Sequence, residues 1–102
     1  MPKGAISGLR VVELATGVAG PFCGKLFADY GADVIKVEPP GSGDVTRQWG
    51  PFRHDHPHPE ESGLFFFLNT NKLGVTLDPA AADGRKQLLA LLAEADVLID
   101  SG

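Results

Sequence analysis

Short apolar runs and one amphipathic segment alternate over the first forty residues. Residues 9–14 (LRVVEL) form a short apolar run with two adjacent valines, which predicts a strand. Residues 21–30 have apolar side chains at helical spacing, between Pro21, which suits a first helical position, and Gly31, which suits the position after a helix. Residues 33–38 (DVIKVE) predict a second strand. Strand, helix and strand in this order predict a βαβ unit and a parallel sheet.

The alternation continues after a long polar segment. Residues 39–61 are rich in Pro, Gly, His and Asp without periodicity, which predicts a long loop. Residues 62–69 are compatible with a buried strand or a short helix. Residues 74–78 predict a third strand, residues 82–95 a second amphipathic helix and residues 97–99 a fourth strand. The whole pattern predicts an α/β fold with a parallel sheet of about four strands and flanking helices.

The predicted fold is incomplete as it stands. A parallel sheet is normally covered on both faces, and two helices barely provide that cover. A final strand at residues 97–99 also leaves a sheet edge exposed. We therefore expect residues 1–102 to be one piece of a larger fold, with no second domain in this chain.

Composition narrows the functional classes. The chain has 102 residues, 43% hydrophobic and 22% charged, which disfavours disorder, and its net charge of −4 disfavours a nucleic-acid partner. No apolar run approaches the length of about 18 residues that a membrane span needs, so no membrane span is expected. A single cysteine, Cys23, and no secretory signal in the first five residues predict a cytoplasmic protein.

The turn after the first strand is a candidate ligand site, because ligands of open α/β sheets bind at the carboxyl ends of the strands. Gly17, Gly20 and Gly24 match the dinucleotide fingerprint G-x-G-x-x-G poorly. Glu38 stands 21 residues after Gly17, however, where a ribose-binding acid would be expected. Nucleotide binding and a simple tight turn both remain open from this pattern.

Other polar residues give weaker signals. Arg47 is either a phosphate partner or a surface arginine, and a lone Lys72 is expected at the surface. The histidines of the segment 54–58 (HDHPH) lack a second cluster of ligands, so no metal site is expected. Cys23 is expected to pack in the core on the buried face of its helix. The sequence shows no Ser/His/Asp set, paired acids or Walker loop.

Three segments taken together resemble a known family. They are residues 8–14 leading into 19–23, residues 31–44 with Arg47, and residues 69–72 with 77–78. In order and spacing they resemble the amino-terminal part of the class III CoA-transferases, the group of formyl-CoA transferase, carnitine CoA-transferase and α-methylacyl-CoA racemase. The resemblance covers nearly the whole chain.

The resemblance implies a Rossmann-like large domain that binds CoA or acyl-CoA, and an interlocked homodimer. The residues it implies for the CoA site are Val18, Ala19, Pro39, Arg47, Asn71, Lys72 and Leu73. Two of these positions depart from the family: several members have an arginine in place of Pro39, and some have a glutamine in place of Val18. The catalytic residues of the family match no position here, so the resemblance implies that this chain alone is inactive.

Three functions therefore compete. The first is the CoA-binding amino-terminal region of an acyl-CoA transferase, which moves CoA between carboxylic acids, or of an acyl-CoA racemase. The second is a small NAD- or FAD-binding Rossmann module, which Glu38 favours and the glycine spacing disfavours. The third is a non-catalytic fragment that packs or oligomerises.

Overall fold

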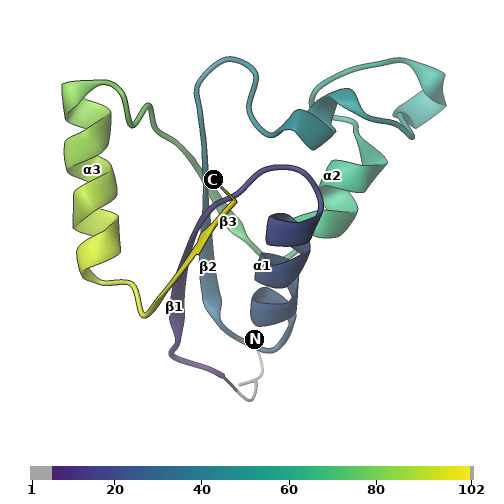
Figure 1. Ribbon diagram of the computed structural model, residues 1–102. Coiled ribbons are helices and arrows are strands. Elements are labelled where there is room, and N and C mark those ends of the chain that lie inside the picture. Colours follow the sequence, from purple (N-terminus) through teal and green to yellow (C-terminus); the bar gives the residue numbers. More distant parts are fainter. Residues whose placement is uncertain (1–5, 102) are drawn as a thin grey trace.

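A parallel four-stranded sheet forms the centre of the protein (Figure 1). The computed structural model describes residues 6–101, so the amino-terminal segment in which no secretory signal was recognised lies outside the described residues. The strand order is β3-β2-β1-β4. The strands are β1 (Arg10–Leu14), β2 (Asp33–Glu38), β3 (Leu73–Thr76) and β4 (Val97–Asp100).

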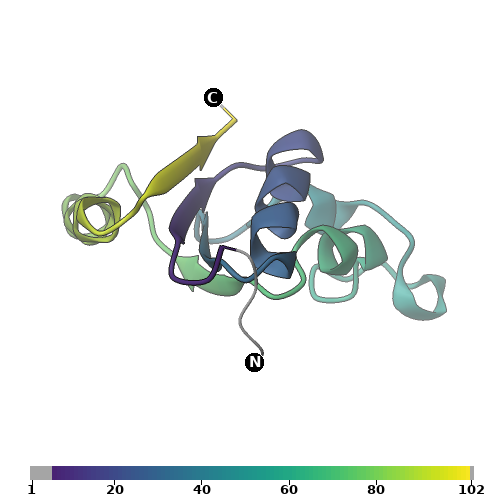
Figure 2. The ribbon, with the colours of Figure 1, turned by 90° about the horizontal axis from the view of Figure 1, so that it is seen from below.

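Helices lie on both sides of this sheet (Figure 2). Helix α1 (Ala19–Asp29) packs on one face, where Ala28 meets Val11 and Val34. Helix α3 (Ala82–Ala93) packs on the other face, where Leu88 belongs to the same cluster as Val12 and Val37. Successive side chains along a strand point to opposite faces of the sheet. Strands β1 and β2 therefore contribute side chains to both faces, and a helix covers each face. The predicted α/β fold is confirmed.

The segment 62–69, which the sequence left open, contains a short helix, α2 (Gly63–Leu68). The Ser62 hydroxyl accepts a hydrogen bond from the Phe65 N–H at 3.2 Å and so caps the first turn. This cap, together with the packing of Leu68 in the interior, selects helix over strand.

The long loop and several element ends differ from the sequence prediction; α1, for example, begins two residues before Pro21. The loop at residues 39–61 contains two 3₁₀ helices, η1 (Val45–Gln48) and η2 (Arg53–Asp55). Strand β3 begins one residue earlier and ends two residues earlier than predicted. It ends there because the chain turns at Asp78, whose carboxylate accepts a hydrogen bond from the Ala80 N–H at 3.0 Å.

The predicted buried face of α1 is correct for Phe27, which packs against the core, and wrong for most of its other residues. Cys23 is exposed, and so are Phe22 and Leu26 on the same helix and Tyr30, which follows it. The buried residues of α1 are small or compact, namely Pro21, Gly24 and Ala28. Small side chains let the helix backbone approach the sheet closely, and this close packing outweighs the apolar character of the larger residues.

The outer strands of the sheet are β3 and β4. The final strand, β4, thus lies at an edge of the sheet, as the sequence predicted. In the part of the chain that the structure describes, no helix is long and apolar enough to cross a membrane.

Candidate functional site

Two turns lie next to each other at the carboxyl end of the sheet. The turn at residues 15–18 follows β1, and the loop at residues 39–48 follows β2, which pairs with β1. The Thr16 hydroxyl accepts a hydrogen bond from the Val45 N–H at 2.9 Å. In addition, the Gly17 N–H donates to the Asp44 carboxylate at 3.2 Å. Segments 27 to 29 residues apart in sequence are thus joined directly.

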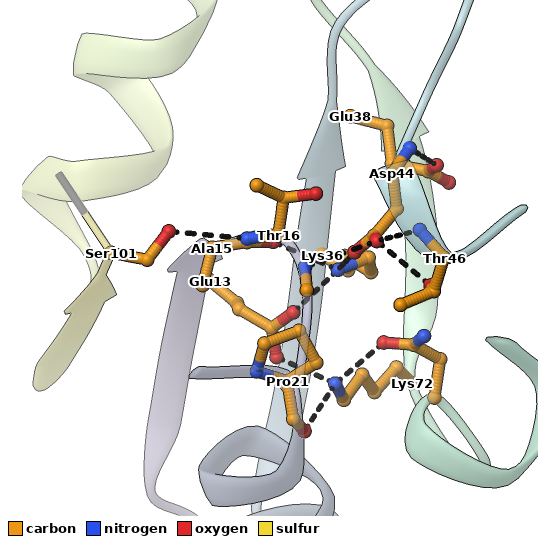
Figure 3. Close-up of polar contacts among 12 residues, drawn as sticks. Glu13, Ala15, Thr16, Pro21, Lys36, Glu38, Asp44, Thr46, Lys72 and Ser101 are labelled. Atoms are coloured by element: carbon orange, nitrogen blue, oxygen red, sulfur yellow. Dashed lines mark hydrogen bonds and ion pairs between the residues drawn. The ribbon is translucent and has the colours of Figure 1, made fainter. Parts of the chain in front are cut away.

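The end of β4 is tied to the same turn. The Thr16 N–H donates to the hydroxyl of Ser101 at 3.2 Å (Figure 3). The turn after β1 is therefore held from both sides, by the segments that follow its two neighbouring strands.

A cavity of about 520 Å³ opens beside these turns. It is mostly apolar, with Val37 and Leu88 in its wall and the loop residues Pro39 and Val45 at its rim. Thr16 also lines it. Small-molecule sites in α/β proteins have this composition and this position, at the carboxyl ends of parallel strands.

A buried lysine lies beneath the two turns. The ammonium of Lys36 contacts the carboxylates of Glu13 and Asp44, each at 2.7 Å, and donates to the Ala15 carbonyl at 3.0 Å. These three side chains are at most 2% exposed. Lys36 therefore joins β1, the turn after it and the loop after β2.

A second buried lysine extends the cluster. The Lys72 ammonium pairs with the other oxygen of Glu13 at 2.6 Å and donates to the Pro21 carbonyl at 2.9 Å and to the Asn69 side chain at 2.7 Å. Its side chain is 2% exposed, so the expectation of a surface lysine is wrong. The sequence showed no partner near Lys72 because Glu13 lies 59 positions before it.

The pKa values of this cluster follow from burial and pairing together. Burial alone would raise the pKa of Asp44, but the Lys36 ammonium and the N–H and hydroxyl groups of Thr46 lower it to about 2. Burial lowers the pKa of Lys72, and its pairing with Glu13 only partly offsets this effect. Asp44 thus stays ionised at neutral pH.

Glu38 and Arg47 form a second, separate pair. The guanidinium of Arg47 donates two hydrogen bonds of 2.8 Å to Glu38, and the Asp44 N–H donates a third at 2.7 Å. Burial would raise the pKa of Glu38, but the hydrogen bonds from Arg47 and Asp44 hold it below its ordinary value. Because both carboxylate oxygens are already bonded, the geometry does not favour the ribose-binding role that its spacing indicated.

Arg47 is also held from its other sides. It donates to the Pro59 carbonyl at 3.0 Å and to Glu60 at 3.3 Å, and its guanidinium lies 3.8 Å from the centre of the Phe65 ring. These contacts hold the loop after β2 in place. The carboxylates of Glu38 and Glu60 neutralise the charge of Arg47.

The structure divides the predicted CoA residues into two groups. Val18, Ala19, Pro39 and Arg47 all lie in the segments that follow β1 and β2, with Val18 and Ala19 exposed at the start of α1. Asn71, Lys72 and Leu73 instead lie at the beginning of β3.

The second group faces a different part of the protein. Asn71 and Leu73 line another cavity of about 520 Å³ at the amino ends of the strands. Of this group, Lys72 alone extends toward the first group, through its contact with Pro21.

Sequence reasoning placed Thr16 and Asp44 in the strand-end turns without giving either a role of its own, and it missed Lys36. A signal for Lys36 was present, because it is a charged residue inside an apolar strand, and so is Glu13 in the neighbouring strand. Charged residues are almost never fully buried unless they are paired. Two such positions in adjacent predicted strands therefore indicate an internal ion pair.

The histidine segment at residues 54–58 is exposed. Among residues 6–101, no three His, Cys, Asp or Glu side chains are grouped so that they could hold a metal ion.

Comparison with known proteins shows the family to which the chain belongs. The family model described as CoA-transferase family III matches residues 6–102. This chain belongs to that family. The resemblance drawn from the three sequence segments is confirmed at the level of the family.

Characterised relatives in this family share about two residues in five with the chain. A succinyl-CoA–D-citramalate CoA-transferase from Chloroflexus aurantiacus is 38% identical over 98% of the chain. A formyl-CoA:oxalate CoA-transferase from Rhodopseudomonas palustris is 43% identical over 95% of the chain. The chain spans only 24% and 22% of these two relatives, about a quarter of a family III CoA-transferase.

The fold comparison gives the same picture. A crystal structure of a CAIB/BAIF family protein from Brucella suis superimposes with a TM-score of 0.83 at 41% identity. The match covers 95% of this chain and 25% of that protein. The sheet and helices described above thus correspond to one part of a larger family III fold.

Proposed function

We propose that this chain is the CoA-binding amino-terminal region of a CoA-transferase that exchanges CoA between carboxylic acids. The observation that carries the proposal is the pair of joined turns beside the cavity at the carboxyl end of the sheet, in a chain of this family. Both relatives described above are named for CoA transfer, which favours transfer over racemisation.

The proposed CoA site comprises Val18, Ala19, Pro39 and Arg47 at the carboxyl end, which Lys72 reaches from the start of β3, whereas Asn71 and Leu73 line the cavity at the other end of the sheet. Val18 and Ala19 offer exposed backbone where α1 begins, and Pro39 lines the apolar cavity. Arg47 and Lys72 act through the order they give to the backbone around them, because their charged groups are already paired inside the protein.

The isolated chain is proposed to be inactive. Acyl transfer through an enzyme anhydride needs a carboxylate nucleophile beside the thioester. The three buried carboxylates at this edge, Glu13, Glu38 and Asp44, are each paired with a lysine or an arginine. A carboxylate held in this way is a structural group, and the nucleophile belongs elsewhere in the complete enzyme.

A homodimer in the cytoplasm is part of the same proposal. Apolar side chains are exposed on α1 (Phe22, Leu26 and Tyr30) and on α2 (Phe66 and Phe67). Exposed apolar side chains on two neighbouring helices support a covering partner, and a second copy of the chain is the partner proposed here.

Calorimetric titration of the 102-residue chain with CoA and, separately, with NAD tests the ligand. CoA is expected to bind and to raise the free energy of unfolding by about 2.7 kcal/mol at a hundredfold excess over Kd. NAD is expected to have no effect, because both oxygens of Glu38 are already held by Arg47 and the Asp44 N–H. Binding of NAD without binding of CoA would refute the proposal in favour of the dinucleotide module.

An acyl-exchange assay with several acyl-CoAs tests the second half of the proposal. No turnover is expected from the isolated chain. Turnover that disappears when Glu13, Glu38 or Asp44 is replaced would show instead that a catalytic carboxylate lies within this chain.

A further inference from the structure

The two turns at the carboxyl end of the sheet are held by side chains and not by the hydrogen bonds between strands. Gly17 has a φ of +88°, and neither Gly17 nor Val45 belongs to a strand of the sheet. Their N–H groups donate instead to Asp44 and to Thr16. The position of each turn thus depends on side chains that come from the other turn.

Asp44 connects this surface arrangement to the interior. One of its oxygens accepts from the N–H groups of Gly17 and Thr46, at 3.2 and 2.9 Å, and the other pairs with Lys36. A single buried carboxylate therefore caps η1, holds the turn after β1 and binds the ammonium beneath both (Figure 3). Removing the whole side chain of Asp44 would release three contacts at once.

Lys36 has no donor left for a ligand. Its three N–H groups are matched by Glu13, Asp44 and the Ala15 carbonyl. The cluster of Glu13, Lys36, Asp44 and Lys72 contains two acids and two lysines, so its net charge is zero. A neutral, fully paired cluster beneath a binding surface does not itself attract an anion.

A buried cluster of this kind contributes little to stability compared with well-packed apolar residues, because desolvation of the charges offsets their attraction. Its geometry, by contrast, is highly restrictive. Helix α1 lies so close to the cluster that a Cβ added at Gly24 would collide with the Glu13 carboxylate. The cluster therefore determines where the turn and the first residues of α1 lie.

We propose that Lys36 and Asp44 are positioning residues for the CoA site, which hold the turn at residues 15–18 against the loop at residues 43–46, with Thr16 as the outer link between them. This inference rests on the proposed function. It adds residues that do not contact the ligand themselves and act through the backbone of the two turns.

The outer link is tested by a matched pair of variants. Thr16→Val removes the hydroxyl with little change of shape, and Thr16→Ser keeps it. Thr16 is exposed, so both variants are expected to fold. Hydrogen exchange by NMR is expected to be at least tenfold faster at the Val45 amide in Thr16→Val than in Thr16→Ser. The exchange of Val12, inside the sheet, should be equal in both.

The buried part is tested by a charge-balanced double variant, Lys36→Met with Asp44→Asn. The asparagine can still accept from Gly17 and Thr46, whereas the ion pair is lost. Gly17 and Val45 are expected to exchange at least tenfold faster than in the parent. Val34→Ala, at the other end of β2, is the control for a general loss of stability. In this variant the exchange rates of the Gly17 and Val45 amides should change no more than those of amides in the core.

CoA titration of the same variants measures the consequence for the ligand. Thr16→Val and the double variant are expected to raise the Kd for CoA at least fivefold, and Thr16→Ser and Val34→Ala less than twofold. Unchanged exchange at Gly17 and Val45, or faster exchange with unchanged affinity, would overturn the inference.

The exchange and titration results separate this inference from the proposed function. A parent chain that binds no CoA contradicts the proposed function and the ligand part of the inference. The exchange rates still decide whether the cluster holds the turns. If the double variant does not fold, the comparison of Thr16→Val with Thr16→Ser alone decides whether the link between the two turns positions the CoA site.

Discussion

The guanidinium of Arg47 binds the carboxylate of Glu38 through two parallel hydrogen bonds, from Nε to Oε2 and from Nη2 to Oε1, each 2.8 Å long. Glu38 ends β2, and Arg47 lies in η1. The pair therefore closes the loop between them. It stands above the buried cluster as a second, shallower set of ionic contacts at the same edge of the sheet.

Replacement of Arg47 tests this pair. Arg47→Ala is expected to lower the free energy of unfolding by about 2 kcal/mol, because Glu38 loses two charge-assisted hydrogen bonds at a site that is mostly buried. Arg47→Lys should recover less than half of this loss, since an ammonium cannot form the paired contact. Urea unfolding measures both. Arg85→Ala, at an exposed position, is the control and should change stability by less than about 0.5 kcal/mol. Equal stability of Arg47→Ala and the control would show that the pair contributes nothing.

Two glycines of the same loop form a second matched test. Gly41 and Gly43 both have a positive φ, +88° and +67°, but a Cβ at Gly41 would meet nothing within 4 Å. A Cβ at Gly43 would lie 2.6 Å from the Glu38 carboxylate and 3.0 Å from the Arg47 side chain.

Gly41→Ala is therefore expected to cost about 1–2 kcal/mol, from backbone strain alone. Gly43→Ala should cost at least about 1 kcal/mol more, because the Glu38–Arg47 pair must move. Thermal or urea unfolding of the two variants gives the difference directly. Equal losses would mean that the pair accommodates the methyl group freely.

Acid stability depends on the lowered pKa values of Asp44 and Glu38. A carboxyl group with a lower pKa in the folded state binds protons more readily when the chain is unfolded, so it stabilises the fold at neutral pH and loses this effect as the pH falls. The contribution of Asp44, whose pKa falls from 3.8 to about 2, is about 2 kcal/mol.

We therefore expect the free energy of unfolding to decrease as the pH falls from about 4.5 towards 2. Urea unfolding across this range measures the slope, and Asp44→Asn should make it shallower. An identical slope in that variant would show that Asp44 does not contribute.

Association through α1 and α2 is the fourth prediction. The 102-residue chain is expected to form dimers, and Phe66→Ser combined with Phe67→Ser should shift it towards monomers, because both rings are more than half exposed and would be covered by the partner. Sedimentation velocity measures the distribution. Leu89→Ser on α3, also more than half exposed, is the control and should leave the dimer unchanged. A dimer that resists the double replacement would place the interface elsewhere.

The fold was largely predictable because periodicity reports burial directly. The apolar runs of β1 and β2 and the helical spacing of α3 each indicate one element, and their order indicates a parallel sheet. The face of α1 was not predictable in this way. Phe27 packs against the core, but Phe22 and Leu26 are exposed, because the close approach of Gly24 and Ala28 to the sheet determines the orientation of the helix.

The position of the candidate site could be predicted from the sequence, but only some of its residues could. Strand-end turns follow from the strand order, so the segments around Val18 and Pro39 could be selected from the sequence. The partners of Lys36 and Lys72 could not, because Asp44 and Glu13 approach them only once the sheet is formed. The pair of Lys36 with Glu13 left a signal, because both charges stand inside apolar strands, but the pairs of Lys36 with Asp44 and of Lys72 with Glu13 leave no local pattern.

The exposed position of Cys23 has a practical consequence. It is the single cysteine of the chain, and it lies in the first half of α1, a few residues after Val18 and Ala19. A maleimide fluorophore or a nitroxide would therefore attach at one defined point without any engineered substitution. Its emission or line shape would report ligand arrival and turn motion beside the proposed site in real time, in the unaltered sequence.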